Sequence, residues 1–246
     1  YGIGSFRLLL VFLTRPMPPP LHNVMPTADA FDPYHDLSSQ QRDQLQQYEQ
    51  LLRRYNDTLN LISPETTDAI TERHIVHSLT LRVRDFPAGA RIVDWGSGGG
   101  LPAIPLAIAY PDTEVIAVDS VGKKMRAVRS MARRLGLDNL FAWDGRAENW
   151  PDTAHYSVSR ATAPLAKLWQ WHTRAAAELP SVHGDADWKP GLITLKGGDL
   201  SEEIEALRTH DPSVRIRQIP LHALLQDAAK HPGYFAEKCM VAVQTS

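Results

Sequence analysis

The stretch Arg91-Ile-Val-Asp-Trp-Gly-Ser-Gly-Gly-Gly-Leu-Pro-Ala-Ile-Pro-Leu106 decides the fold. It predicts a buried strand, a glycine-rich turn and a helix that begins near Pro102. Gly96, Gly98 and Gly100 alternate in the turn, and glycine lets a ligand lie against bare backbone. The start of the helix directs unpaired N–H groups toward the same place. This arrangement is typical of a nucleotide-like ligand held at the carboxyl end of a first parallel strand.

The spacing of these glycines separates two classes of ligand. The dinucleotide fingerprint requires Gly or Ala three residues after its second glycine, but Leu101 stands three residues after Gly98. What remains is Asp-x-Gly-x-Gly-x-Gly, which begins at Asp94 and resembles motif I of the class I S-adenosylmethionine-dependent methyltransferases. A glycine-rich loop without a ligand is the alternative. Three alternate glycines between an apolar strand and an apolar helix argue against it.

The composition limits the class of protein. With 246 residues, of which 43% are hydrophobic and 22% charged, the chain can form one large α/β domain with an appendage. The net charge is −2, so contact with nucleic acid requires a local basic patch. Cys239 is the single cysteine, which excludes an internal disulfide and a multi-cysteine metal site. No apolar run has the length of a membrane span, and we expect a cytoplasmic monomer without a metal.

Three segments are predicted along the chain. Residues 1–35 are rich in proline and are expected to be poorly ordered. Their apolar patch at residues 6–13 lacks a small-residue cleavage site, so an upstream extension is favoured over a signal peptide. Residues 36–87 are expected to form a helical segment, and residues 88–246 a Rossmann-like domain.

Residues 38–62 are predicted to form a long amphipathic helix. Ser38 and Gln41 match a capping box at its start. Its apolar face carries, at spacings of three and four, Leu45, Tyr48, Leu52, Tyr55 and Leu59. Asn56 and Asn60 lie one turn apart near its end, and this spacing is compatible with helix capping or with a contact to substrate.

A second helical stretch is predicted to begin at Ser63-Pro64-Glu65. Its two histidines, His74 and His77, lie three residues apart on one face. A metal site would need an acidic residue or a cysteine at ligand spacing, and the sequence has none there. We therefore interpret both side chains as polar or half-buried histidines.

From residue 91 onward strand and helix patterns alternate, which is typical of a parallel α/β sheet. The strand at residues 114–119 ends at Asp119, 23 positions after Gly96. Nucleotide-binding folds place there the carboxylate that binds ribose hydroxyls, although the same position suits a helix-capping Asp. Further strands are expected at residues 140–143, 156–159, 192–195, 214–219 and 238–243, with Cys239 buried in the last. The predicted class is α/β, a mostly parallel seven-stranded Rossmann-like sheet with helices on both faces and an N-terminal helical appendage.

The predicted helix at residues 121–135 has an apolar stripe and a strongly basic face. The stripe contains Val121, Met125, Val128, Met131 and Leu135. The basic residues are Lys123, Lys124, Arg126, Arg129, Arg133 and Arg134, with no acidic residue among them. Such a run is usually a solvated face. Because its start adjoins the predicted ribose site, a phosphate backbone could also run along it.

Seven short motifs follow one another in an order that resembles one known family. They are Asn56 to Asn60, Arg73-His74-Ile75 with Ser78-Leu79, Asp94 to Pro105, Asp119-Ser-x-Gly-Lys123, Arg146-Ala-Glu148, Ser159-Arg160-Ala161 and Leu195-Lys196-Gly197. Over about residues 45–200 the pattern resembles the bacterial small-subunit ribosomal RNA guanine-N7 methyltransferases, also called glucose-inhibited division protein B.

The resemblance implies a cofactor and its site. S-adenosylmethionine would be contacted by Gly96, Leu101, Ala147, Glu148 and Arg160. Gly98 and Asp119 join this set from the spacing pattern itself. The resemblance to methyltransferases further implies that the turn at Asp144-Gly-Arg-Ala-Glu148 faces the adenine ring.

The resemblance also implies a substrate, a guanine in a hairpin of 16S RNA in the small ribosomal subunit. The candidate RNA contacts are Lys123, Lys124, Arg126 and Lys196. The chain departs from the family pattern in three places: Gly96-Ser-Gly-Gly-Gly100 replaces Gly-Thr-Gly-Pro-Gly, Ala103 replaces a Gly, and His77 replaces an Asp.

The implied chemistry needs no general base. Guanine N7 exposes a lone pair, so alignment with an electrophilic methyl group is the main requirement. Three alternatives stay open: a methyltransferase acting on another substrate, a nicotinamide-dependent oxidoreductase, and a non-catalytic RNA-binding module. Leu101 argues against the oxidoreductase, and the glycine loop together with Asp119 argues against the binding module.

Overall fold

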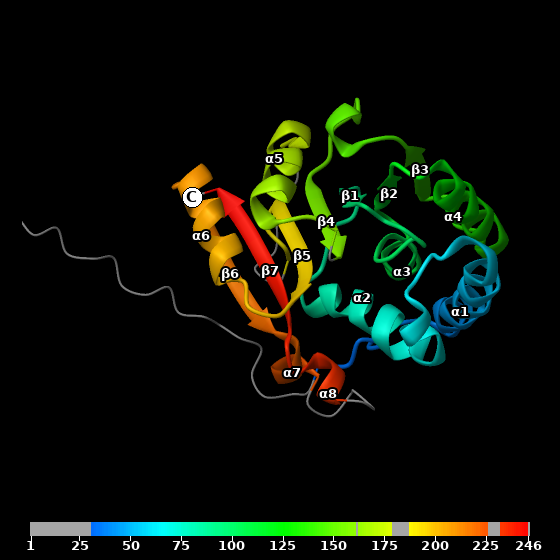
Figure 1. Ribbon diagram of the computed structural model, residues 1–246. Coiled ribbons are helices and arrows are strands. Elements are labelled where there is room, and N and C mark those ends of the chain that lie inside the picture. Colours follow the sequence, from blue (N-terminus) through cyan, green and yellow to red (C-terminus); the bar gives the residue numbers. More distant parts are fainter. Residues whose placement is uncertain (1–30, 161, 179–186, 226–231, 246) are drawn as a thin grey trace, which may run out of the picture.

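A seven-stranded sheet forms the centre of the computed structural model, which describes residues 31–160, 162–178, 187–225 and 232–245 (Figure 1). The strands are β1 (Arg91–Trp95), β2 (Glu114–Asp119), β3 (Leu140–Asp144), β4 (Tyr156–Arg160), β5 (Gly191–Gly197), β6 (Val214–Pro220) and β7 (Lys238–Thr245). Their order in the sheet is β3-β2-β1-β4-β5-β7-β6. Strands β1 to β5 pair in parallel, and β7 runs antiparallel to both β5 and β6. The predicted mostly parallel sheet is confirmed.

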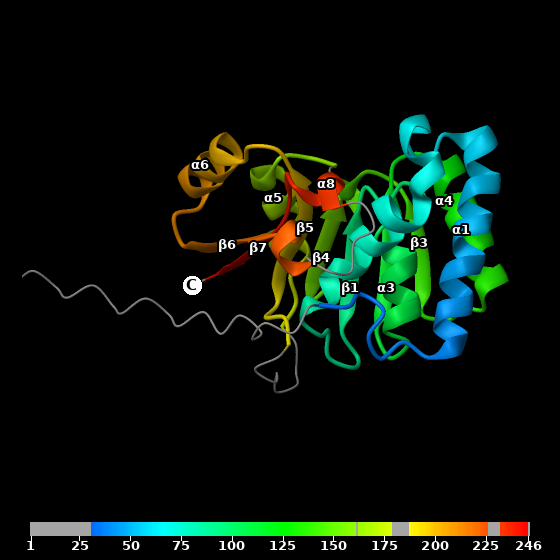
Figure 2. The ribbon, with the colours of Figure 1, turned by 90° about the horizontal axis from the view of Figure 1, so that it is seen from below.

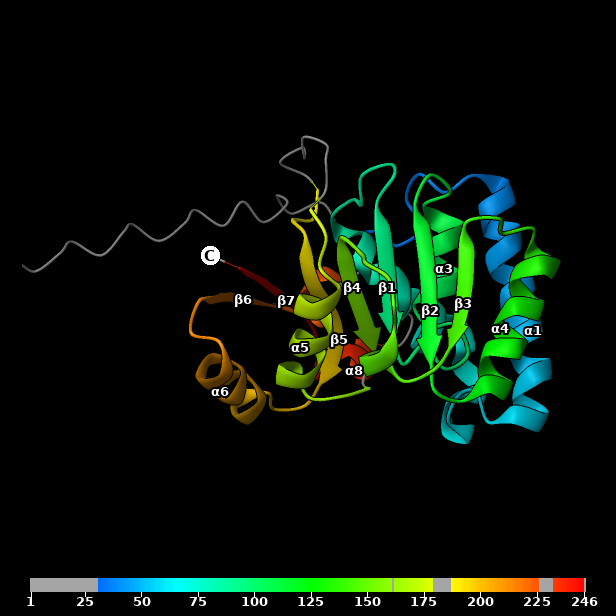
Figure 3. The ribbon, with the colours of Figure 1, turned by 90° about the horizontal axis from the view of Figure 1, so that it is seen from above.

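Helices cover both faces of the sheet, as the two opposite views in Figures 2 and 3 show. One face is covered by α1 (Ser39–Leu59), α3 (Ala103–Ala109) and α4 (Gly122–Leu135), and the other by α5 (Leu165–Ala175) and α6 (Ser201–His210). Short helices also occur at η4 (Ala147–Asn149), α7 (Leu221–Leu224) and α8 (Pro232–Phe235). No helix in the described ranges combines the length and the apolar character that crossing a membrane would demand.

The amphipathic patterns of α1 and α4 have the predicted direction. On α4 the side chains of Met125, Val128, Met131 and Leu135 are buried. On α1 the capping box of Ser38 and Gln41 is present, and Leu45, Tyr48, Leu51 and Leu52 are buried. These side chains belong to one hydrophobic core that continues into β1, β2 and α3.

Polar contacts bind α1 to the sheet domain as well. Gln44 Nε2 donates to the carbonyl of Leu135 at the end of α4 (2.8 Å), and Tyr55 Oη lies 2.7 Å from Ser130 Oγ. The helical segment and the sheet thus share one continuous core. Phe31 and Tyr34 pack against this core too, so ordered structure begins before residue 36. The prediction for residues 1–30 lies outside the described residues.

The second helical stretch differs from a plain α-helix. It consists of η1 (Pro64–Ala69), a π-helix η2 (Thr71–Val76), α2 (His77–Leu79) and η3 (Thr80–Val83). π-helical turns are rare and often occur at functional sites. His74 and His77 are buried rather than half-buried, with 5% and 4% of their surface exposed.

Cys239 was expected to be buried in the last strand and is instead half-buried. It pairs in register with Lys196 of β5 and with Pro220 of β6. The Cys239 side chain is therefore more exposed than those of Val241 and Val243 on the same strand, which are fully buried.

Candidate functional site

The turn after β1 adopts the left-handed backbone that its glycines predict. Gly96, Gly98 and Gly100 have φ values of 72°, 58° and 92°, a region that side chains with a β-carbon disfavour. The amides of Gly96 and Ser97 both donate to the carbonyl of Val118 on β2, at 2.8 and 2.9 Å. The loop is therefore tied to the neighbouring strand at the carboxyl edge of the sheet.

Asp119 joins the glycine loop to the start of α4. Its Oδ2 accepts a hydrogen bond from the amide of Gly98 (3.0 Å), and its Oδ1 accepts one from the amide of Val121 (2.8 Å). The sequence left open whether Asp119 binds a ligand or caps a helix. The carboxylate binds the amide of Val121, the residue before α4, and also lies on the wall of a hollow beside the loop.

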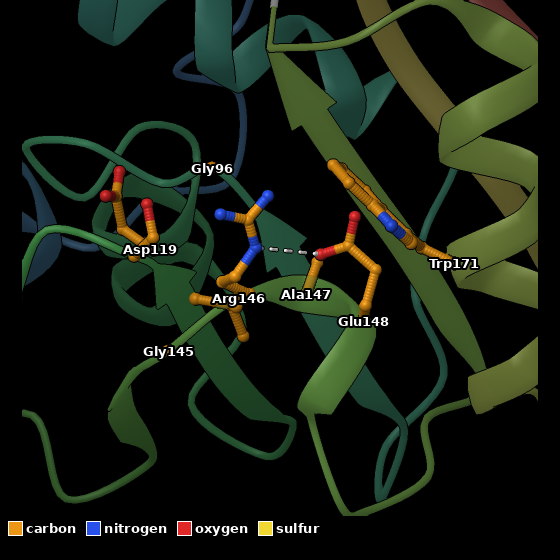
Figure 4. Close-up of a pocket in the computed structure, with 9 residues that line it drawn as sticks. Gly96, Asp119, Gly145, Arg146, Ala147, Glu148 and Trp171 are labelled. Atoms are coloured by element: carbon orange, nitrogen blue, oxygen red, sulfur yellow. Dashed lines mark ion pairs between the residues drawn. The ribbon is translucent and has the colours of Figure 1, made fainter.

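This hollow has a volume of about 210 Å³ and lies at the carboxyl ends of β1, β2 and β3. Its lining consists of Gly96, Val118, Asp119, Ser120, Gly145, Arg146, Ala147, Glu148 and Trp171. In Figure 4 Asp119 lies on one side, Glu148 and Trp171 lie on the other, and the Arg146 side chain extends between them. Arg146 Nε is 3.8 Å from Glu148 Oε2.

Glu148 and Trp171 are connected through Lys167. Lys167 Nζ lies 3.0 Å from Glu148 Oε1 and 5.6 Å from the centre of the Trp171 ring. Glu148's own backbone N–H and the Lys167 ammonium lower the pKa of the Glu148 carboxyl. The Trp171 Nε1 is buried and has no hydrogen-bond partner among the described residues. The hollow thus offers a carboxylate and an aromatic face on one wall.

Trp171 is not among the site residues that the sequence predicts. It lies on α5, outside the buried residues of that helix, which are Leu165, Leu168, Trp169, His172 and Ala175. The signal that could have found it is a large aromatic side chain on the less apolar face of an amphipathic helix.

The loop after β4 covers the glycine turn. A β-carbon built on Gly96 would overlap the Thr162 side chain and lie 2.8 Å from Thr162 Cβ. Thr162 Oγ1 also lies 3.4 Å from the Gly96 carbonyl oxygen. Gly96 is thus required both for its backbone conformation and for this close approach.

Lys196 binds the loop after β4 through its side chain and is buried. Only 7% of its surface is exposed, and its Nζ donates to the Ala163 carbonyl (2.6 Å) and to Glu203 Oε2 (2.8 Å). Glu203 Oε2 also accepts a hydrogen bond from the amide of Leu165 (2.8 Å). The interpretation of Lys196 as an RNA contact does not fit this placement, because its charge is directed into the protein.

The predicted cofactor residues divide into two groups. Gly96, Asp119, Ala147 and Glu148 line the hollow, and Gly98 adjoins it through its bond to Asp119. Leu101 does not line the hollow: its side chain is buried in the main core, and its amide donates to the Ser97 carbonyl. Arg160 is also absent from the lining. Its side chain turns toward the helical segment, where it contacts residues of η2.

The helical segment supports the glycine turn from behind. Tyr48 is fully buried, and its Oη donates to the Gly99 carbonyl at 3.0 Å. A β-carbon on Gly99 would lie 2.8 Å from Leu52 Cδ1 and 3.2 Å from Leu61 Cβ. Residues of α1 and of the turn after it therefore pack directly against the glycine turn.

The two asparagines near the end of α1 serve as caps. Asn56 Oδ1 accepts a hydrogen bond from the amide of Ile62 at 2.9 Å. Asn60 is the C-cap residue with a left-handed backbone. Both observations agree with the capping interpretation.

Asp94 lies behind the glycine turn and is fully buried. Its Oδ2 accepts a hydrogen bond from the amide of Ala103 (3.1 Å). Burial raises the pKa of its carboxyl to about 7, against the opposing effects of the Ala103 amide and the neighbouring Ser97 side chain. Asp94 thus fastens the start of α3 to the end of β1.

The basic face of α4 is exposed at Lys123, Arg126, Arg133 and Arg134 and half-buried at Lys124 and Arg129. Arg129 Nη2 bonds to Asp144 Oδ1 at 2.8 Å. The start of α4 follows Ser120, which lines the hollow. Within the ranges that the structure describes, no three His, Cys, Asp or Glu side chains gather to hold a metal ion.

Comparison with known proteins places this site in a family. A family model described as rRNA small subunit methyltransferase G matches residues 41–222. The chain belongs to this family. The match includes the helical segment, the glycine turn and the hollow.

Two relatives in the rRNA small subunit methyltransferase G family illustrate the extent of the similarity. The chain is 56% identical over 216 residues to the ribosomal RNA small subunit methyltransferase G of Salinibacter ruber, covering 88% of this chain and 98% of the relative. It is 37% identical over 175 residues to the protein of the same name from Cytophaga hutchinsonii, covering 71% and 83%.

Solved structures of other methyltransferases share the fold. A precorrin-6y C5,15-methyltransferase from Geobacter metallireducens has a TM-score of 0.50 at 11% identity, covering 70% of this chain and 87% of that one. A ribosomal protein L11 methylase from Lactobacillus delbrueckii subsp. bulgaricus also has a TM-score of 0.50, at 14% identity, covering 71% and 79%. At such identities the likeness extends to the class I methyltransferase fold alone.

Proposed function

We propose that this member of a methyltransferase family transfers a methyl group from S-adenosylmethionine to N7 of a guanine in 16S ribosomal RNA. The observation that carries the proposal is the convergence of three strand ends on one hollow. The glycine turn of β1, Asp119 of β2 and the η4 turn after β3 all border it. The protein would act in the cytoplasm, as a monomer.

The hollow suits the parts of S-adenosylmethionine. Asp119 would accept hydrogen bonds from the ribose hydroxyls, as strand-end carboxylates do in nucleotide-binding folds. Trp171 and Ala147 would flank the adenine ring, and the Glu148 carboxylate offers a polar partner nearby. The glycine turn with Gly98 lets the amino-acid moiety approach the backbone closely. Leu101 and Arg160 would complete the contacts beyond the hollow.

The chemistry requires alignment more than proton transfer. When bound, S-adenosylmethionine supplies a methyl group on a positively charged sulfur. Guanine N7 presents a lone pair at neutral pH, so no side chain has to remove a proton before attack. The chain's contribution is therefore to hold the two reactants in line and to exclude water from the hollow.

RNA would approach over α4. Lys123, Lys124 and Arg126 lie at its start, next to the hollow. Contacts of this kind to phosphates supply affinity that depends strongly on salt. Lys196 is not included in this surface because it is buried in its bonds to Glu203 and Ala163.

Nucleoside mass spectrometry of 16S RNA from a deletion strain would test the proposal. N7-methylguanosine should be lost from one site and restored by the wild-type gene. A deletion strain with unchanged methylation would reject the substrate.

Thermal unfolding with ligands tests the cofactor separately. S-adenosylhomocysteine should raise the Tm, because a ligand that binds only the folded state stabilises it. A shift with NAD and none with S-adenosylhomocysteine would instead favour the oxidoreductase. RNA binding without any cofactor shift would favour the non-catalytic binding module.

A further inference from the structure

Arg160 is a half-buried cation whose surroundings the proposed function does not explain. It ends β4 at the carboxyl edge of the sheet. Among the described residues no carboxylate forms an ion pair with it. The described hydrogen bonds of its guanidinium are both made by Nη1, to the Arg73 carbonyl (3.2 Å) and to His74 Nδ1 (2.7 Å). Nη1 carries two protons, and these two bonds use both.

The donor and the acceptor can be assigned for every hydrogen bond that links Arg160, His74, Thr66 and the Ser63 carbonyl. A guanidinium has only donors, so His74 Nδ1 must accept. His74 Nε2 lies 2.7 Å from Thr66 Oγ1, and the Thr66 hydroxyl donates its own proton to the Ser63 carbonyl at 2.7 Å. Thr66 Oγ1 therefore accepts from His74 Nε2–H. One orientation satisfies all four groups, with His74 neutral and its proton on Nε2.

The electrostatic surroundings favour the same state. Burial, together with the nearby Arg160 and Arg73 guanidinium groups, lowers the pKa of His74 to about 3. A protonated imidazole would present a second N–H to Arg160 across 2.7 Å. His74 is consequently excluded as a general base toward substrate, because its one lone pair is already bound to Arg160.

We propose that His74 is a positioning residue, which fixes the Arg160 guanidinium so that its remaining N–H groups face the bound cofactor. The inference rests on the proposed function, in which Arg160 contacts S-adenosylmethionine. Thr66 acts one step further back by holding the proton of His74 on Nε2. Through these hydrogen bonds the η1 and η2 helices fix the position of the Arg160 side chain, which lies 86 residues after His74 in the sequence.

A set of four variants separates positioning from simple packing. His74→Ala removes the acceptor for Arg160, whereas His74→Asn returns an amide oxygen near the place of Nδ1. Thr66→Val removes the acceptor for Nε2–H, whereas Thr66→Ser keeps it. His172→Asn is the matched control, because His172 is also buried and bonds through Nδ1 to Ser157 Oγ, on the other face of the sheet.

S-adenosylhomocysteine affinity, measured by calorimetry on the full chain, is the first readout. His74→Ala and Thr66→Val should weaken binding, by about tenfold for His74→Ala, since a hydrogen bond to a charged group is lost. His74→Asn, Thr66→Ser and His172→Asn should stay close to wild type. Equal losses in His74→Ala and His74→Asn would overturn the inference.

A double-mutant cycle gives the second readout. If His74 acts through Arg160, adding His74→Ala to Arg160→Ala should change affinity no further. Additive losses would assign His74 a packing role and overturn the inference. Wild-type protein that fails to bind S-adenosylhomocysteine would instead reject the proposed function, so the two failures are distinct.

The tautomer can be observed without activity. Nitrogen-15 NMR of the labelled imidazole should show His74 protonated on Nε2 alone, and Arg160→Ala should shift the Nδ1 resonance. A proton on Nδ1 in the wild-type protein would contradict the assigned direction of the chain and overturn the inference.

Discussion

Replacing Gly96 with alanine should destabilise the protein more than the same replacement at Gly136. Both glycines have left-handed backbones, with φ values of 72° and 68°. A β-carbon in this conformation costs about 1–2 kcal/mol, and at Gly136 nothing lies within 4 Å of it. At Gly96 the β-carbon also overlaps the Thr162 side chain and lies 2.8 Å from Thr162 Cβ. Because Thr162 is exposed, its loop can shift, which places the added cost near the low end for overpacking, about 1 kcal/mol.

Urea unfolding and calorimetry with S-adenosylhomocysteine measure the two consequences. Gly136→Ala should lower stability modestly and leave cofactor affinity unchanged, because it lies at the far end of α4. Gly96→Ala should lower stability further and weaken the cofactor about tenfold or more, since the displaced loop no longer closes over the turn. Adding Thr162→Gly to Gly96→Ala should recover the excess loss of stability.

Equal stabilities for the two alanine variants, with normal cofactor binding in both, would refute this reasoning. The same holds if Thr162→Gly gives no relief, because the close approach of Thr162 to Gly96 would then play no part in the site.

Reversing Lys123, Lys124 and Arg126 to Glu should weaken RNA binding and flatten its salt dependence, because fewer counterions are released. If the salt dependence of RNA binding is unchanged, or if reversing the arginines of α6 and β6 to Glu weakens RNA binding equally, the basic face of α4 is only solvated and does not bind RNA. The single-turnover methylation rate should show no histidine limb from about pH 6 to 8.5, because burial lowers the pKa of His74 to about 3 and that of His77 well below its ordinary value. Any limb near pH 7 should come from Asp94, whose pKa burial raises to about 7, whereas a limb near pH 6.5 that disappears in His77→Ala would contradict the prediction. Stability should fall as pH drops below about 6.5, since the unfolded chain then binds protons that the buried imidazoles of His74, His77 and His172 lack. Asp94, whose carboxyl pKa is raised to about 7, offsets part of this loss, and urea midpoints that stay constant down to pH 4.5 would refute the prediction.

The strand ends were the part of the site that the sequence could predict. Gly96, Asp119 and Ala147 each follow an apolar run, and parallel strands bring such positions to one edge. Trp171 was missed because helical periodicity assigns it to the outer face of α5 and gives no information about which loop lies beside that face.

Side-chain direction at the end of a strand was less predictable. Lys196 follows Leu195 at the end of β5, where a basic residue would be expected to reach solvent. Glu203, contributed by α6, draws the ammonium inward instead. Arg160 turns toward His74 for a similar reason. In both cases the partner lies on another element, so its position depends on tertiary packing and not on local pattern.

The support of the glycine turn by Tyr48, Leu52 and Leu61 has a consequence for how the protein opens and closes in solution. Side chains of α1 pack against the glycine turn in a buried contact. The backbone amides of α1 and of the turn should therefore exchange with deuterium through the same cooperative opening. Cofactor binding would then slow exchange in α1, although no residue of that helix lines the hollow. The deuterium exchange rates of the α1 amides would thus report whether the cofactor is bound.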